Sequence, residues 1–194
     1  LPGSVGFPVS DTYYKIVDVS DPTKVLLWGE EGEIAVKGPQ LMKGYWNKPE
    51  ETANIITEDG YYLMGDIGKV DQDGYLIITD RKKNMIVVSG LKVYPRDIEE
   101  VLYEHPAVAE VAIVGVPHKF RGETVKAFIV LRDNETGSSE EFIDFCKGRM
   151  ARYKIPRLVE FIDELPRSAV GKVLHRELRE KEWKKAGKSK MIDS

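Results

Sequence analysis

The chain has 194 residues, of which 42% are hydrophobic and 31% are charged, and its formal net charge is −3. This composition is that of an ordinary globular protein of one or two domains, and it gives no global basic field for nucleic acid. No apolar run is long enough to span a bilayer, and the single cysteine, Cys146, excludes an intramolecular disulfide and fits a reducing, cytoplasmic compartment.

Short β-rich runs dominate residues 1–79. Pairs of Asp, Gly and Pro separate the runs, and one short helix is expected near Pro49–Ile56. This rhythm predicts a small β-rich, barrel-like subdomain. The runs are Thr12–Val19, Gly32–Lys37, Tyr61–Met64 and Gly74–Ile78.

Four charged residues, Asp80 to Lys83, stand between two strand-like runs. Gly90 then frees the backbone to turn, and Pro95 opens a helix at the position where its missing N–H costs least. From the residues alone, the charged break is either a solvated turn within one sheet or a boundary between two domains. Charge runs are usually solvated faces, so chemistry alone favours the turn.

Residues 84–185 alternate between strands and helices. Strands are expected at Val108–Val114, Val125–Leu131 and Leu158–Ile162, and a charged helix at Leu174–Lys185. A capping box at Ser138 begins another helix, whose apolar face includes Cys146, so this cysteine is expected to be a buried small hydrophobe. The pattern predicts an α+β domain with an antiparallel sheet flanked by helices, followed by a frayed polar tail at 186–194.

Four segments in order resemble motifs of the adenylate-forming superfamily, which includes acyl-CoA synthetases, aryl-CoA ligases, peptide-synthetase adenylation domains and luciferases. The resemblance covers nearly the whole chain and implies the C-terminal portion of an acyl-CoA synthetase, that is, a fatty-acid–CoA ligase. Met64 departs from the second motif, which usually has Thr there, so a hydroxyl contact is lost. The segments are Gly32–Glu50, Tyr61–Asp66, Asp80–Glu99 and Leu165–Lys172.

The resemblance also implies a domain organisation. Residues 1–79 would be the β-rich end of a large N-terminal domain, 80–83 the hinge, 84–185 a mobile C-terminal domain and 186–194 the tail. The chain begins without Met inside a strand-and-turn pattern, which fits a fragment. The family's phosphate loop and acyl pocket would lie upstream, so the chain by itself is expected to be inactive.

Lys172 is the residue that the resemblance marks as catalytic. A P-loop is excluded, because Pro166 and Val173 stand where that motif needs Gly and Ser or Thr. In the superfamily's last motif the Lys binds the acyl carboxylate and the α-phosphate region. A Lys on a Gly-flexed loop brings a point charge to negative charge developing on phosphorus.

Asp66 and Arg81 match the family's two ribose contacts. An ionised carboxylate offers acceptors to two adjacent sugar hydroxyls, and an Asp that caps a turn is the alternative for Asp66. Lys83 matches the hinge residue, so its implied role is conformational.

Four further residues are candidates for contact with CoA: Ser89, Gly90, Lys92 and Arg121. Gly90 matches a backbone site lining the pantetheine tunnel, where a side chain would block the thiol. Arg121 would pair with a CoA phosphate, although a plain turn explains Arg121-Gly122-Glu123 equally well. Lys92 is a weaker candidate of the same kind.

The expected function is ATP-dependent activation of a carboxylic acid as an acyl-adenylate and its transfer to CoA. ATP, CoA and Mg²⁺ are the implied cofactors, and the Mg²⁺ would arrive with ATP because no histidine or cysteine cluster has ligand spacing. Expected partners are the three substrates and the upstream domain of the same protein, with no nucleic acid, and a homodimer is left open.

Other functions stay open on the sequence. The chain fits a fragment of an aryl-CoA ligase, a stand-alone nucleotide- or CoA-binding regulatory module, or a structural domain whose charged residues lie on the surface. Acyl chain length cannot be read, since the acyl pocket would lie upstream.

Overall fold

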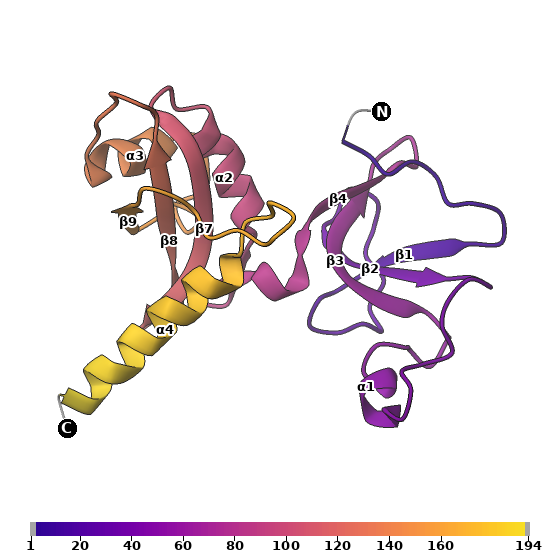
Figure 1. The fold of residues 1–194 in the computed structure, drawn as a ribbon. Coiled ribbons are helices and arrows are strands. Elements are labelled where there is room, and N and C mark those ends of the chain that lie inside the picture. Colours follow the sequence, from indigo (N-terminus) through magenta and orange to yellow (C-terminus); the bar gives the residue numbers. More distant parts are fainter. Residues whose placement is uncertain (1–2, 193–194) are drawn as a thin grey trace. The chain divides into compact units, whose positions relative to one another are not determined.

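The computed structural model describes residues 3–192, and it divides into two compact units with the boundary between Lys83 and Asn84 (Figure 1). Each unit has its own sheet and its own buried clusters of apolar side chains. The α+β class predicted from the sequence is confirmed.

The first unit is an antiparallel meander in which β1 (Tyr13–Val17), β2 (Gly32–Lys37), β3 (Tyr62–Val70) and β4 (Leu76–Arg81) pair in chain order. The edge strands β1 and β4 do not pair with each other in this sheet, so the barrel-like subdomain expected from the sequence is an open sheet. The short helix α1 (Pro49–Ala53) lies between β2 and β3 in the chain.

Both faces of the central strand β2 are covered. Ile34 belongs to one apolar cluster with Ile16, and its neighbour Ala35 belongs to another with Val17. Successive side chains of a strand point to opposite faces, so the two clusters lie on the two sides of the sheet.

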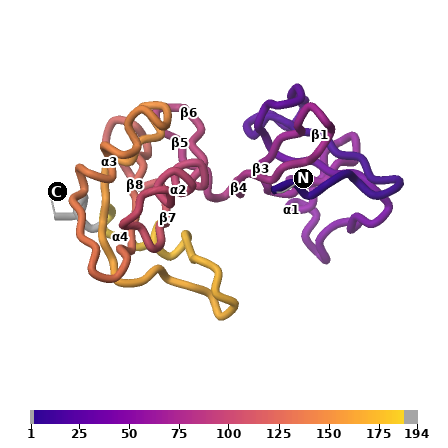
Figure 2. The backbone as a smooth tube through the Cα atoms, turned by 90° about the horizontal axis from the view of Figure 1, so that it is seen from above, coloured from indigo at the N-terminus to yellow at the C-terminus, as the bar shows by residue number. Residues whose placement is uncertain are grey.

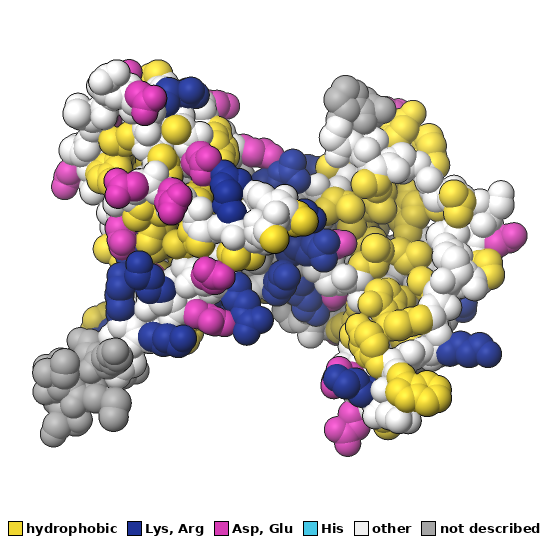
Figure 3. Space-filling view, in the orientation of Figure 1, with side chains coloured by type: hydrophobic (Ala, Val, Ile, Leu, Met, Phe, Trp, Pro, Cys, Tyr) yellow, Lys and Arg dark blue, Asp and Glu magenta, His cyan; other side chains and the backbone are white. Residues whose placement is uncertain are grey.

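Large apolar side chains remain exposed on the first unit, and Figure 3 shows hydrophobic side chains gathered over it. Single exposed apolar residues are normal, but a gathering of this kind is typical of a contact surface. We call the exposed large apolar side chains of this unit its apolar surface, and they include Val5, Phe7, Val9, Tyr13, Leu27, Trp28 and Trp46.

The second unit is built on the long hairpin of β7 (Val108–His118) and β8 (Gly122–Leu131), with β5 (Ile86–Val88) and β6 (Leu91–Val93) completing the path β6-β5-β8-β7. The short strand β9 (Leu158–Phe161) pairs with β8 in parallel, which corrects the expectation of a purely antiparallel sheet. The reason is its connection: α3 (Ser139–Cys146) lies between β8 and β9 in the chain, and a helical crossover returns the chain in the same direction.

Helices cover both faces of this sheet. Ile98 of α2 (Pro95–Tyr103) and Phe142 of α3 pack with Ile113 in one cluster, whereas Leu178 of α4 (His175–Ile192) packs with Ala112 and Val114 in the other. The alternation of β7 residues between the two clusters follows from the period of two in a strand. The 3-10 turn η1 (Lys82–Asn84) precedes β5.

The local helix signals agree with the structure. Pro95 occupies the first turn of α2, and the Ser138 Oγ accepts a hydrogen bond from the Glu141 N–H at 3.2 Å while the Glu141 Oε2 accepts one from the Ser138 N–H at 3.4 Å. The predicted capping box is therefore confirmed.

Helix α4 runs to Ile192, beyond the Lys185 end that the sequence suggested, and residues 193–194 of the expected tail lie outside the described residues. No proline follows Lys185, and one glycine costs a helix only about 1 kcal/mol, so nothing in this segment stops the helix.

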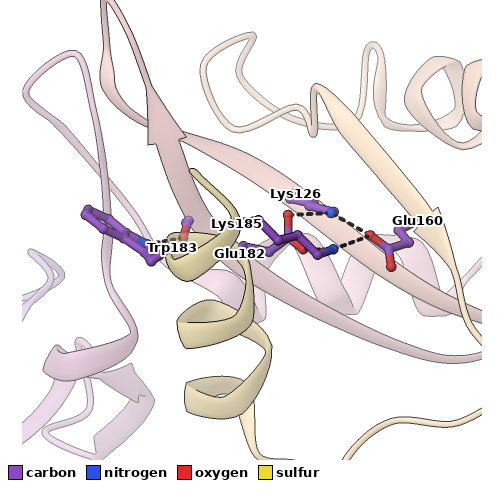
Figure 4. Close-up of polar contacts among 6 residues, drawn as sticks. Lys126, Glu160, Glu182, Trp183 and Lys185 are labelled. Atoms are coloured by element: carbon purple, nitrogen blue, oxygen red, sulfur yellow. Dashed lines mark hydrogen bonds and ion pairs between the residues drawn. The ribbon is translucent and has the colours of Figure 1, made fainter. Parts of the chain in front are cut away.

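Charged side chains fasten α4 to the sheet (Figure 4). The Lys126 Nζ, on a residue that is 8% exposed, lies 2.6 Å from Glu160 Oε2 and 2.7 Å from Glu182 Oε2. The Lys185 Nζ lies 2.6 Å from the other Glu182 oxygen, and the Trp183 indole N–H donates to the Gly115 carbonyl at 3.2 Å. These contacts pair the buried ammonium, which would otherwise be costly.

The substitution Glu182→Gln tests this network. Burial by itself raises the pKa of the Glu182 carboxyl, but hydrogen bonds from Lys126 and Lys185 outweigh it and hold the pKa below its ordinary value. A lowered pKa stabilises the folded state above the unfolded value of about 4.3, and this stability is lost as the pH falls through the folded pKa. We expect the variant to lose about 1–2 kcal/mol at neutral pH and to converge with the parent chain in acid.

The measurement is denaturant unfolding followed by Trp183 fluorescence, with the exposed Trp28 and Trp46 replaced by Phe so that the signal reports the second unit alone. Glu135→Gln makes the same charge change at an exposed residue that has no ion pair within the described part of the chain, and it should change little. A pH-independent loss in Glu182→Gln would contradict the ionic explanation.

Candidate functional site

Asp66 and Arg81 face each other across two paired strands. They are register partners in β3 and β4, and the Arg81 Nε lies 2.7 Å from the Asp66 Oδ1. Asp66 is 7% exposed, while the Arg81 side chain is 60% exposed. The structure thus brings together the two residues that the sequence marked as ribose contacts.

The buried oxygen of this pair has unused hydrogen-bonding capacity. The Asp66 Oδ1 is in ion-pair range of Arg81, but the alignment is not that of a hydrogen bond, and no described residue donates one to it. Buried polar atoms usually have a hydrogen-bond partner, and a carboxylate oxygen without one is suited to accept from a ligand hydroxyl. The residues present therefore fit a sugar such as ribose.

A second ion pair lies next to the first one in the chain. The Lys82 Nζ lies 2.6 Å from the Glu33 Oε2, and Glu33 is 2% exposed on the central strand β2. Arg81 and Lys82 are therefore held by two neighbouring strands, β3 and β2. Sequence reasoning treated Glu33 only as part of a structural motif, although a carboxylate within the apolar run Gly32–Lys37 was the available signal.

Lys83 ends the first unit. Its side chain is exposed, and within residues 3–192 no hydrogen bond or ion pair holds it. The two preceding residues differ from Lys83, because Arg81 and Lys82 each form an ion pair with a buried carboxylate.

Ser89 and Gly90 form the two-residue turn between β5 and β6. Their φ angles are +51° and +84°, which is the pattern of a type I′ hairpin turn. A Cβ on Gly90 would meet nothing within 4 Å, so the backbone angle and not crowding within this chain requires glycine here. The backbone angle is therefore one reason for glycine at this position. The resemblance implied a second reason, which is that a side chain would block the pantetheine tunnel.

The other candidates for CoA contact gather around this turn. The Ser89 N–H donates to the Arg121 carbonyl at 3.0 Å, and Val88 pairs with Gly122. Lys92 lies on β6, which pairs with β5. The structure thus brings Ser89, Gly90 and Arg121 together at one end of the sheet.

Phe120 is a neighbour that sequence reasoning missed. Its side chain is 84% exposed between Lys119 and Arg121 in the β7–β8 connection. The signal was present, since an aromatic residue inside the polar run His118–Gly122 is unusual. An exposed ring flanked by two cations suits a ligand that has both an apolar face and anionic groups.

Lys172 lies on the loop between β9 and α4, which extends from the body of the second unit (Figure 2). The Lys172 N–H donates to the Ser168 Oγ at 3.2 Å, and its carbonyl accepts from the Ser168 N–H at 2.8 Å. The side chain is exposed, and among the described residues it has no hydrogen bond or ion pair, including none with Ser89 or Arg121. The backbone is therefore fixed while the ammonium stays available.

The remaining titratable residues give no metal site. In the part of the chain that the structure describes, no group of three or more His, Cys, Asp and Glu side chains is placed to hold an ion. His105 is buried against the rings of Phe142 and Phe145, and the His175 Nε2 lies 2.8 Å from Glu99.

Cys146 is 0% exposed at the end of α3, and burial raises the pKa of its thiol to about 11. It is a core residue, as expected from the sequence, and a poor nucleophile. Of the helices within the described residues, none combines the length and the apolar character that crossing a bilayer requires.

Comparison with known proteins identifies the family. Residues 97–172 match the model of the AMP-binding enzyme C-terminal domain, and residues 1–46 match the model of the AMP-binding enzymes. The chain belongs to the AMP-binding enzymes. The superfamily resemblance drawn from the four sequence motifs is thereby confirmed.

The relatives are ligases of greater length. The chain is 49% identical over 181 residues to a long-chain-fatty-acid–CoA ligase of Bacillus subtilis (strain 168), covering 93% of this chain and 32% of the relative. It is 50% identical over 178 residues to the ligase of the same name from Escherichia coli O6:H1, covering 92% and 31%. The chain spans about a third of the length of the curated relatives it matches.

A solved structure agrees with both units. The crystal structure of ATP-bound MatB from Rhodopseudomonas palustris matches with a TM-score of 0.87 and 38% sequence identity, covering 93% of this chain and 36% of that one.

Two substitutions at Gly90 separate the two reasons for glycine. Gly90→Ala should destabilise the second unit by about 1–2 kcal/mol, because an L-residue is strained at positive φ, whereas Gly90→Asn should cost less, because Asn tolerates this region. Urea unfolding measures both, and equal losses would contradict the backbone explanation. If glycine were needed here only for open space, both variants would instead be about as stable as the parent chain.

The buried thiol gives a second measurement. At pH 8 the raised pKa leaves Cys146 with about a hundredfold less thiolate than a free cysteine, so a chromogenic disulfide reagent should label the native chain very slowly. Labelling in denaturant is the control, and it should proceed at the ordinary rate. Fast labelling of the folded chain would show that α3 does not shield the sulfur.

Proposed function

We propose that this chain is part of an ATP-dependent acyl-CoA ligase that activates a carboxylic acid as an acyl-adenylate and transfers the acyl group to CoA. The observation that carries the proposal is Lys172: its backbone is tied down inside a loop, its ammonium is exposed, and its motif lies in the segment that matches the AMP-binding C-terminal domain. In this role the ammonium binds the acyl carboxylate and the α-phosphate region and stabilises charge that develops during attack.

Asp66 and Arg81 are proposed to hold the nucleotide. The buried Asp66 oxygen accepts from a ribose hydroxyl, and the exposed Arg81 guanidinium, oriented by Asp66, donates to another acceptor of the nucleotide. Mg²⁺ enters with ATP, since it prefers phosphate oxygens together with few protein ligands. ATP, when bound, would supply the adenylyl group that activates the acid, and pyrophosphate would be the leaving group.

Lys83 is proposed as the hinge between the first unit and a mobile second unit. The ion pairs of Arg81 and Lys82 keep the preceding residues on the first sheet, and Lys83, which follows directly, is held by neither unit's described side chains. Rotation at this residue would let the second unit present different surfaces at different steps.

The CoA side is assigned to the second unit. Ser89 and Gly90 offer backbone free of a bulky side chain, while Arg121 and Lys92 offer cationic groups to phosphate. Phe120 adds an exposed aromatic face beside Arg121. This gathering of backbone, charge and ring supports a thioester-forming role for this end of the sheet.

The proposed substrate is a fatty acid, because the relatives are long-chain-fatty-acid–CoA ligases. The apolar surface of the first unit supports an upstream large domain of the same protein as partner, and we propose that the 194-residue chain alone is inactive. A cytoplasmic location and a homodimer stay predictions.

The substitution Lys172→Ala, made in the ligase that contains this chain, tests the proposal. We expect adenylate formation to fall by roughly a thousandfold, because removing one preorganised charge at a reacting centre has effects of this size. Thioester formation from supplied acyl-adenylate should be spared. Lys181→Ala, at another exposed lysine of the second unit, is the matched control.

Pyrophosphate release and thioester absorbance measure the two half-reactions separately. An equal loss of both half-reactions in Lys172→Ala would refute the proposal that Lys172 acts in adenylation and not in thioester formation. Unchanged adenylation in Lys172→Ala, with nucleotide binding intact, would instead favour a regulatory nucleotide-binding module.

A further inference from the structure

The loop that carries Lys172 has an internal ladder. Gly171, at φ +79°, donates its N–H to the Ser168 carbonyl at 2.8 Å, and Leu174 donates to the Pro166 carbonyl at 2.8 Å. Together with the two contacts between Ser168 and Lys172, these bonds close a small hairpin. A hairpin this short is marginal in water by itself, so its position depends on what fastens it to the sheet.

One side chain fastens the tip of this hairpin. The Arg167 Nη1 donates to the Gly171 carbonyl at 2.7 Å, and its Nη2 lies 2.7 Å from the Glu110 Oε1. The guanidinium therefore joins the peptide directly before Lys172 to a carboxylate on β7. We call this pair of contacts the Arg167 bridge.

Glu110, the residue of the bridge that lies on the sheet, is part of a strand pair. It lies in β7 opposite Val130 of β8, directly after an irregularity in the register at Val108–Glu110. Bulges of this kind redirect side chains next to functional sites. The neighbouring even-numbered residue Ala112 packs in the cluster beneath α4, so Glu110 belongs to the same face of the sheet as the loop.

The two ends of the loop are anchored by apolar side chains. Leu165 before the loop and Leu178 after it are 3% and 6% exposed, and both pack in that same cluster. These anchors fix the two ends of the loop but do not hold its tip. The contact between the tip and the sheet is made by the charged side chain of Arg167. The tip carries Lys172.

We infer that Arg167 and Glu110 are positioning residues that hold Lys172 for the adenylation step. A half-exposed ion pair alone contributes little, but the planar guanidinium makes two contacts in a fixed geometry, and small displacements of a reacting group lower rates strongly. The inferred effect on adenylation rests on the proposed function. The Arg167 bridge itself can be tested whether or not the proposed function is correct.

The first experiment uses amide hydrogen exchange in the 194-residue chain. Arg167→Gln and Glu110→Gln should each speed exchange of the Gly171 and Lys172 amides by about five- to tenfold, and the double variant should add little, because both remove one bridge. Arg176→Gln is the matched control, since Arg176 is an exposed arginine whose ion pair among the described residues is with Glu180 on its own helix. Exchange in Arg167→Gln equal to that in the control would overturn the inference.

The second experiment measures adenylation in the ligase that contains this chain. Arg167→Gln should lower kcat for adenylation by about tenfold with little change in KM for ATP, and Arg167→Lys, which keeps the charge but not the planar fork, should lie between. In a Lys172→Ala background, Arg167→Gln should have no further effect, because it acts through Lys172. An equal loss in thioester formation, or a further loss without Lys172, would overturn the positioning role.

The two failures are distinguishable. Unchanged adenylation in Lys172→Ala alone would remove the proposed function and with it the catalytic role of the bridge. Faster exchange without any kinetic change in Arg167→Gln would leave the proposed function standing and overturn only the positioning inference.

Discussion

The antiparallel pairing of β7 with β8 is the interaction on which the second unit depends. It sends alternate side chains into two apolar clusters, one beneath α2 and α3 and the other beneath α4. It also helps to place several functional candidates of this unit: Ser89 bonds to the β7–β8 connection, and the loop of Lys172 reaches Glu110 on β7. A shift of this hairpin by one residue would exchange the two faces and displace all of them together.

In the first unit the corresponding constraint is the burial of two carboxylates. Glu33 and Asp66 lie on neighbouring strands, and a buried carboxylate without a cation is costly. Arg81 and Lys82 meet that requirement, and as a consequence the end of β4 is fastened to the sheet at two successive residues. Charge pairing thus fastens the chain up to Lys82, directly before the boundary between the two units.

Much of this structure could be predicted from local sequence. The capping box at Ser138 and the Pro95 helix start depend on neighbouring residues, and they were read correctly. The parallel strand β9 and the contact between Glu110 and Arg167 were not, because they join segments far apart in the chain whose meeting is decided by the fold. Motif resemblance supplied the candidate residues of the site, but only the structure shows that Asp66 keeps an oxygen to which no described residue donates a hydrogen bond.

The docking of α4 has a consequence for solution conditions. Within the described side chains of this helix one residue, Leu178, is buried, and two ion pairs join the helix to β8, Glu182 with Lys126 and Arg179 with Glu123. Dissolved ions screen exposed charges more than buried ones, so rising ionic strength weakens the pair of the 39% exposed Arg179 before the buried pair of Lys126. Since the Lys172 loop leads directly into α4, the position of Lys172 would respond to the salt concentration while the sheet beneath stays intact.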